Sequence, residues 1–194
     1  MKKTTFLVCL FSLFIIPNSY AGSIDHNQKK NNIGLLIGSS EADFPNSKYE
    51  ITYGLSYGRT YLEGDLEIGL NVFSSKVTTV ALGKKWFYRD TPVLIKANYR
   101  VYDNFRAGLQ VGPTDRNLIY EGKDADSYGS TSFSYGPTIS YIHELADNFS
   151  LGVEAYMLKV GKATQKVKEE GNDVTINFGE VTYTGGLFSF RYHF

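Results

Sequence analysis

The chain has 194 residues with 20 basic and 20 acidic side chains, so its formal net charge at pH 7 is zero. That balance provides no basic excess for a nucleic-acid partner, and a content of 15 Tyr and 13 Phe excludes a disordered chain. The single cysteine, Cys9, lies in an apolar N-terminal segment, so the rest of the chain can form no disulfide.

The N-terminus has the pattern of a secretory signal peptide. Met1–Lys3 is basic, Phe6–Ile16 is almost continuously apolar, and Ser19-Tyr20-Ala21 provides the small residues that signal peptidase reads. The apolar run is shorter than the about 20 residues that a membrane-spanning helix needs. We therefore expect export by the Sec pathway, removal of residues 1–21, a short periplasmic leader at 22–31 and one domain at 32–194.

The remaining sequence alternates between apolar and polar residues, the period of a β-strand with two different faces. Residues 66–73 read Leu-Glu-Ile-Gly-Leu-Asn-Val-Phe, and the pattern recurs at 105–112 and 149–156. A short turn precedes each of these segments, and another alternating segment precedes each turn. The predicted strands are, in chain order, residues 33–37, 49–61, 66–73, 93–101, 105–112, 133–141, 149–156 and 176–194.

Residues 77–88 leave the number of strands open. They can extend the fourth strand outward, or they can form a strand of their own. In the second case residues 93–111 could be one long strand, because the alternation continues across Asp103-Asn104. Ten strands is a third count, and we favour eight.

The connections between the predicted strands differ in length. Those at 42–47, 114–130 and 162–174 are long, polar and charged, whereas the others are short turns. Outer-membrane barrels have this arrangement, with short turns in the periplasm and long loops outside. After Ala21 no run approaches 18 apolar residues, so a closed barrel is the remaining way to span a bilayer.

The aromatic residues indicate which face of the barrel points outward. The interior of an eight-stranded barrel is only just wide enough for side chains, so Tyr53, Tyr99, Phe133 and the other aromatics of the apolar face would not fit inside a soluble barrel. We expect them to face lipid, with polar residues in the lumen. The alternative is a periplasmic β-sandwich or a lipocalin-like binder. The expected lumen charges, which can neutralise one another in one network, are Glu50, Glu67, Lys96, Arg100, Arg106, Glu154 and Arg191.

The C-terminus carries the most specific signal. Phe188, Phe190, Tyr192 and Phe194 alternate with polar residues up to the end of the sequence. This resembles the assembly signal of outer-membrane β-barrels, which the outer-membrane assembly machinery is expected to read. The chain resembles small barrels of the OmpA/OmpX superfamily. The resemblance implies an all-β, antiparallel up-and-down transmembrane barrel in a Gram-negative outer membrane, in contact with its lipids and lipopolysaccharide.

The search for catalytic chemistry finds no nucleophile paired with a base. His26, His143 and His193 all fall on or near the expected periplasmic side. Asp124-Ala125-Asp126 lacks the remaining spacing of a calcium loop. We therefore expect no catalysis, cofactor or metal.

The sequence favours a monomeric, non-catalytic barrel that supports the envelope or contacts a surface partner through its long loops. One alternative is a narrow, porin-like channel for small solutes or ions, lined by Arg100, Arg106 and Glu154. A second alternative is a lipid-modifying enzyme of the outer membrane.

Overall fold

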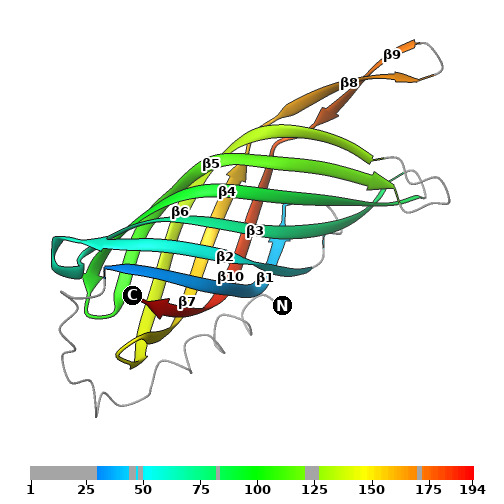
Figure 1. Ribbon diagram of the computed structural model, residues 1–194. Coiled ribbons are helices and arrows are strands. Elements are labelled where there is room, and N and C mark those ends of the chain that lie inside the picture. Colours follow the sequence, from blue (N-terminus) through cyan, green and yellow to red (C-terminus); the bar gives the residue numbers. More distant parts are fainter. Residues whose placement is uncertain (1–29, 44–46, 48–49, 82–83, 121–126, 170–171) are drawn as a thin grey trace.

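The computed structural model describes residues 30–43, 47, 50–81, 84–120, 127–169 and 172–194 (Figure 1). The predicted signal peptide, most of the leader and His26 lie outside the described residues. The strands are β1 (Asn31–Ala42), β2 (Glu50–Tyr61), β3 (Leu66–Ala81), β4 (Lys84–Tyr102), β5 (Phe105–Tyr120), β6 (Ser127–Ala146), β7 (Phe149–Val160), β8 (Ala163–Glu169), β9 (Asn172–Phe178) and β10 (Val181–His193).

Eight of these strands close into one antiparallel barrel in the order β1-β10-β7-β6-β5-β4-β3-β2. The prediction of an eight-stranded barrel is therefore confirmed. The seam between β1 and β10 runs from Asn32, opposite His193, to Ala42, opposite Tyr183. The remaining strands, β8 and β9, form a separate hairpin that continues from β7 and β10 and projects from one end of the barrel (Figure 1).

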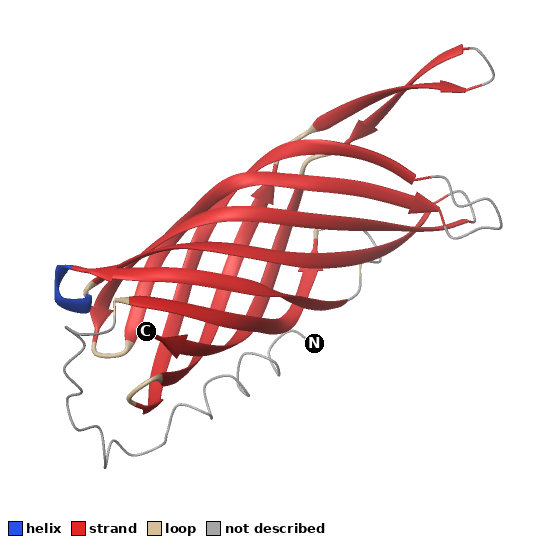
Figure 2. Ribbon diagram, viewed as in Figure 1, coloured by secondary structure: helices blue, strands red, loops and turns tan. Residues whose placement is uncertain are grey.

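The two ends of the barrel differ in their connections (Figure 2). At one end, here called the turn end, β2 and β3 are joined by the single 3-10 turn Leu62–Gly64. Residues 103–104 and 147–148 make the other tight turns of the described chain at this end. Strand β1 begins and strand β10 finishes here as well. The opposite end carries the β8–β9 hairpin and is called the loop end.

Several predicted boundaries are wrong, because the strands continue past the apolar segments. Most of predicted loop 114–130 belongs to β5 and β6, which stay paired from Thr114 with Ser132 to Ile119 with Ser127. Most of predicted loop 162–174 belongs to the β8–β9 hairpin. Residues 77–81 and 84–88 complete β3 and β4 and pair with each other, so 77–88 is neither an extension of one strand nor a strand of its own.

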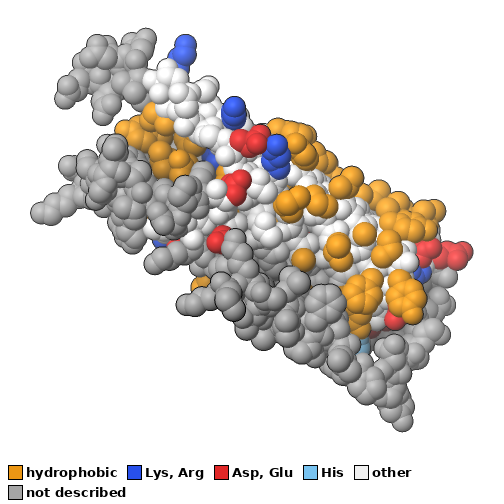
Figure 3. Space-filling model, turned by 180° about the vertical axis from the view of Figure 1, so that it is seen from behind, with side chains coloured by type: hydrophobic (Ala, Val, Ile, Leu, Met, Phe, Trp, Pro, Cys, Tyr) orange, Lys and Arg blue, Asp and Glu red, His pale blue; other side chains and the backbone are white. Residues whose placement is uncertain are grey.

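The barrel has an apolar outer face and a closed interior, as the aromatic content predicted. Leu109 is 67% exposed and Tyr53 is 62% exposed, whereas the alternating residues Gln110 and Thr52 are buried. Figure 3 shows apolar side chains spread over the wall of the barrel, with charged side chains gathered toward its two ends. Such an exposed apolar belt needs a nonaqueous environment, because it far exceeds the usual apolar patch of a soluble protein.

The described part of the chain contains no helix long and apolar enough to cross a membrane.

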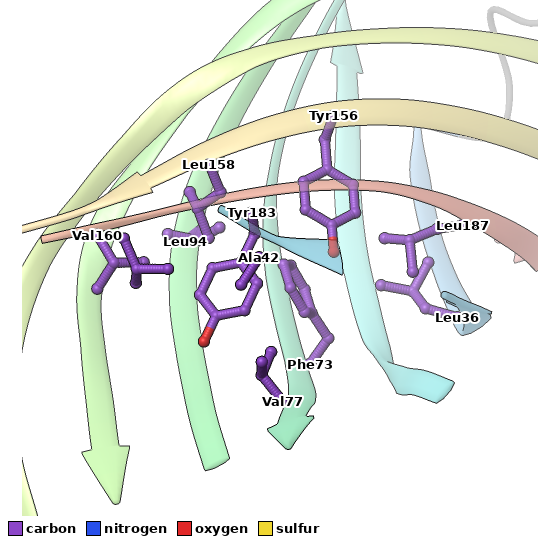
Figure 4. Close-up of a cluster of buried hydrophobic side chains, with 11 residues drawn as sticks. Leu36, Ala42, Phe73, Val77, Leu94, Tyr156, Leu158, Val160, Tyr183 and Leu187 are labelled. Carbon is purple, nitrogen blue, oxygen red and sulfur yellow. The ribbon is translucent and has the colours of Figure 1, made fainter. Parts of the chain in front are cut away.

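The interior toward the loop end is filled by an apolar cluster (Figure 4). Phe73 on β3 and Tyr156 on β7 point into this cluster, and their ring centroids lie 5.5 Å apart. The sequence predicted a polar lumen throughout, and this prediction is wrong for the half toward the loop end. The cluster consists of Leu36, Ala42, Phe73, Val77, Leu94, Tyr156, Leu158, Val160, Val181, Tyr183 and Leu187.

Candidate functional site

The polar half of the lumen, toward the turn end, holds two buried ion pairs. Arg191 Nη1 donates to Glu67 Oε2 at 3.0 Å, and Lys96 Nζ donates to Glu154 Oε2 at 2.8 Å. All four side chains come from the expected lumen set, and each is nearly inaccessible to solvent. Both pairs bridge strands that are not neighbours in the barrel. They therefore tie opposite walls together across the lumen.

The other expected lumen charges make further contacts. Arg100 Nε donates to Asp65 Oδ1 at 2.8 Å at the turn end, and Asp65 was not among the predicted residues. Glu50 lies at the start of β2, where it accepts a hydrogen bond of 2.6 Å from Thr78 Oγ1. Arg106 lies opposite Arg100 on the neighbouring strand. Lys96 and Arg106 both lie near enough to Glu67 to interact with it electrostatically, so Glu67, Lys96, Arg106, Glu154 and Arg191 form one charged group with Arg100 beside it. Glu50 lies apart from this group, at the loop end.

A small pocket, with a volume of about 50 Å³, opens among these residues at the turn end. Glu67, Arg100, Arg106 and His193 contribute to its walls. Its volume has room for only a few water molecules. Two ion pairs, Glu67–Arg191 and Lys96–Glu154, lie on the inner side of the pocket, and the apolar cluster lies beyond them. In the part of the chain that the structure describes, the pocket therefore does not lead into a channel through the barrel.

Arg116 and Asp90 form a third buried pair, at the loop end. Arg116 Nε lies 3.3 Å from Asp90 Oδ2, and neither side chain is more than 1% exposed. Tyr183 donates its hydroxyl to the same Asp90 oxygen at 2.7 Å. Below this group Thr114 and Ser134 share a hydrogen bond of 2.5 Å. Among the described residues, these polar contacts thus lie on the loop-end side of the apolar cluster.

The same arginine holds the root of the β8–β9 hairpin. Arg116 Nη1 donates to the carbonyl oxygens of Gly161 at 3.1 Å and Gly179 at 2.7 Å. Gly161 lies two residues before the hairpin, and Gly179 directly follows it. Phe178, the last residue of β9, is buried, and its ring centroid lies 5.8 Å from the guanidinium carbon of Arg116. We call Asp90, Arg116, Tyr183, Gly161 and Gly179 the hairpin latch.

Sequence reasoning missed the hairpin latch because it ended the strands too early. Asp90 has the inward phase of Lys96 on β4, and Arg116 has the inward phase of Gln110 on β5. Continuing the alternation beyond the apolar segments would have placed both charges in the lumen. The contact with Gly161 and Gly179 had no signal in the sequence, since it depends on how the hairpin folds back.

The histidines show no accessible catalytic arrangement in the described chain. His193 Nε2 lies 2.8 Å from Ser150 Oγ, but Ser150 is completely buried in the lumen. His143 is exposed at the turn end. Among the described residues no three His, Cys, Asp or Glu side chains are grouped to hold a metal ion. Asp124-Ala125-Asp126 lies outside the described residues.

The four aromatic residues of the predicted assembly signal lie on the outer face. Phe188, Phe190, Tyr192 and Phe194 are between 42% and 51% exposed. The ring of Phe149 on β7 stacks on Phe190 at 5.5 Å and packs against Tyr192 at 5.3 Å. The terminal strand thus extends an aromatic surface toward β7 at the turn end.

Comparison with known proteins finds similarity in structure only. No family model matches the sequence, and no curated protein matches it either. Neisserial surface protein A superposes with a TM-score of 0.57 and 11% identity, over 84% of this chain and 97% of that one. Ail, the attachment invasion locus protein of Yersinia pestis, superposes with a TM-score of 0.53 and 12% identity, over 86% of this chain and 99% of that one. The chain therefore has the fold of the small outer-membrane β-barrels, the fold that the OmpA/OmpX-like resemblance implied.

Proposed function

We propose that this protein is a non-catalytic, monomeric β-barrel of the outer membrane that holds the β8–β9 hairpin outside the cell as a surface for interaction. The apolar outer face supports the placement in a membrane, and the aromatic β10 supports recognition by the assembly machinery. Short turns lie in the periplasm in barrels of this kind, so the turn end faces the periplasm and the loop end faces the exterior. The N-terminal signal supports delivery through the Sec pathway.

The observation that carries the proposal is the hairpin latch. An isolated two-stranded hairpin is marginal in water, yet this one is fixed by a buried arginine that bonds both ends of its root. Ser130 Oγ also donates to the carbonyl of Thr164 at 3.3 Å. Fixing a projecting element in advance lowers the entropy lost on binding, which suits a surface that contacts a partner.

The packing of the lumen argues against the channel alternative. A conducting pore requires a continuous aqueous path, but Phe73, Leu94, Tyr156 and Leu158 fill the described lumen between the ion pairs and the hairpin latch. The burial of Ser150 argues in the same way against the enzyme alternative, because a nucleophile must reach its substrate. Both observations favour a structural barrel that displays a surface.

The proposal is tested by replacing residues 163–178 with a short glycine-containing turn. Cells that display the wild-type protein should adhere to at least one member of a panel of immobilised proteins and glycans, and the replacement should abolish that adhesion. A matched variant, with residues 121–126 exchanged for a glycine–serine segment of equal length, should adhere normally. Heat-modified migration on gels verifies that both variants fold. Adhesion that survives the hairpin replacement, or that depends on 121–126 alone, would contradict the proposal.

A further inference from the structure

The outer face of the barrel carries two like charges side by side. Lys76 on β3 lies directly opposite Arg89 on β4, and both side chains are exposed. Lys76 lies four residues after Val72, and Arg89 lies four residues before Val93. Because side chains alternate with a period of two, both cations point outward as these two valines do. Like charges directly opposite each other on neighbouring strands are destabilising. The pair therefore does not contribute to the stability of the barrel by itself.

The position of the pair along the barrel corresponds to the lipid headgroups. The outward residues of β4 are apolar from Val101 to Val93, and that stretch rises about 20 Å at about 3.3 Å per residue and a tilt of about 40°. The apolar band of such barrels is about 25 Å tall. Thr91 follows, and then Arg89. Lys76 and Arg89 are thus the first charged pair beyond the apolar band on these two strands.

The carboxylates beside the pair are bonded elsewhere. Asp115 on β5 accepts a hydrogen bond of 2.9 Å from Asn117 Nδ2. Glu50 accepts one of 2.6 Å from Thr78 Oγ1. Within the described ranges no carboxylate lies in ion-pair distance of Lys76 or Arg89. The Nζ of Lys76 instead lies 4.5 Å from the ring centroid of Phe87.

Another outward cation at the loop end, unlike Lys76 and Arg89, forms an ion pair within the protein. Lys159 on β7 lies 3.0 Å from Glu180, which follows β9, so its charge is balanced by the protein. The Lys76–Arg89 pair has no such balance in the described chain. Two adjacent cations at this depth, with no carboxylate of the described chain in ion-pair distance, are complementary to an external anion.

We propose that Lys76 and Arg89 bind a phosphate group of a phosphorylated glycolipid, lipopolysaccharide, in the outer leaflet. A guanidinium group bonds phosphate through two parallel hydrogen bonds, and an ammonium group adds a point charge. One phosphate between the two side chains relieves their repulsion, while the acyl chains of the same lipid lie against Val72 and Val93. The inference rests on the proposed orientation, in which the loop end meets the outer leaflet.

The test compares lipid binding by the detergent-solubilised protein and by the variant Lys76→Gln/Arg89→Gln. Native mass spectrometry measures binding of lipid A that carries its phosphates and of dephosphorylated lipid A. Each cation near an anionic lipid surface is worth about a fivefold change in affinity. The double variant should therefore bind phosphorylated lipid A about thirtyfold more weakly than the wild type. Dephosphorylated lipid A should bind both proteins equally weakly.

The matched control removes the same charge elsewhere. Lys162→Gln/Lys166→Gln changes two exposed lysines near the hairpin root and should leave lipid A binding unchanged. Excess inorganic phosphate should not displace the lipid, because the acyl chains contribute to binding. Equal binding of lipid A by the wild type and Lys76→Gln/Arg89→Gln, or displacement by inorganic phosphate, would overturn the proposal. The hairpin replacement should retain lipid A binding, so failure of this inference is separate from failure of the proposed function.

Discussion

The substitution Arg116→Ala should destabilise the barrel by about 3–5 kcal/mol, the cost of leaving one charge of a buried pair without its partner. The side chain of Asp90 would then lie in the lumen with only the Tyr183 hydroxyl as a bonding partner among the contacts described above. The carbonyl oxygens of Gly161 and Gly179 would lose their shared donor. Urea titration in detergent measures the loss in the free energy of unfolding. Hydrogen exchange of the β8 and β9 amides measures the loosening of the hairpin, and this exchange should become faster.

Two control variants separate charge burial from the latch. Arg100→Ala removes a pair whose side chains are 36% and 38% exposed, so it should cost no more than about 1 kcal/mol. The double substitution Asp90→Leu/Arg116→Met replaces the buried pair with apolar residues and should recover most of the stability. It should not restore protection of the hairpin, because no donor to the root carbonyls returns. Equal stability of Arg116→Ala and Arg100→Ala would contradict the hairpin latch.

The substitution Gly38→Ala should prevent normal closure of the barrel. A methyl group on Gly38 would overlap the carbonyl oxygen of Gly186 on β10 and lie 2.9 Å from the Cα of Leu187. Both contacts cross the β1–β10 seam, which joins the two ends of the barrel chain. Because the obstructing atoms are backbone, the strands themselves must move, and we expect a loss of about 3 kcal/mol or more, the upper range for overpacking.

The matched control for this prediction is Gly179→Ala. A methyl group there would meet no atom within 4 Å, and the carbonyl that accepts from Arg116 is retained. Heat-modified migration on gels measures the folded fraction of both variants, and urea titration measures their free energies of unfolding. Similar behaviour of the two alanine variants would show that the seam is not packed as described.

Alternation predicted the barrel well because the bilayer makes the two faces of each strand chemically different. Leu109 and Gln110, for example, differ both in polarity and in exposure. Beyond the apolar band both faces meet polar surroundings, and the contrast disappears. Asp115 outside and Arg116 inside are both charged. The strand ends and the hairpin were therefore mistaken for loops.

The lumen was predictable only as a set of inward residues. Glu67 and Arg191 both had the correct phase, but their contact joins β3 to β10 across the interior, which requires the closed strand order. The apolar half had a weaker signal still. Phe73 and Tyr156 continue the inward phase, but they are apolar residues beside apolar outward neighbours such as Val72 and Ala155, so the alternation is obscured there.

The central claim is that this barrel is apolar outside, toward lipid, and sealed inside. Leucine methyl NMR of the protein in lipid nanodiscs tests both parts, with a nitroxide-labelled lipid and then a water-soluble gadolinium chelate as broadening agents. The nitroxide should broaden the exposed Leu35, Leu55 and Leu109 more strongly than the buried Leu94, Leu158 and Leu187, and the gadolinium chelate should leave these buried methyls sharp. Broadening of the buried methyls by gadolinium, or no broadening of the exposed methyls by the nitroxide, would contradict the claim.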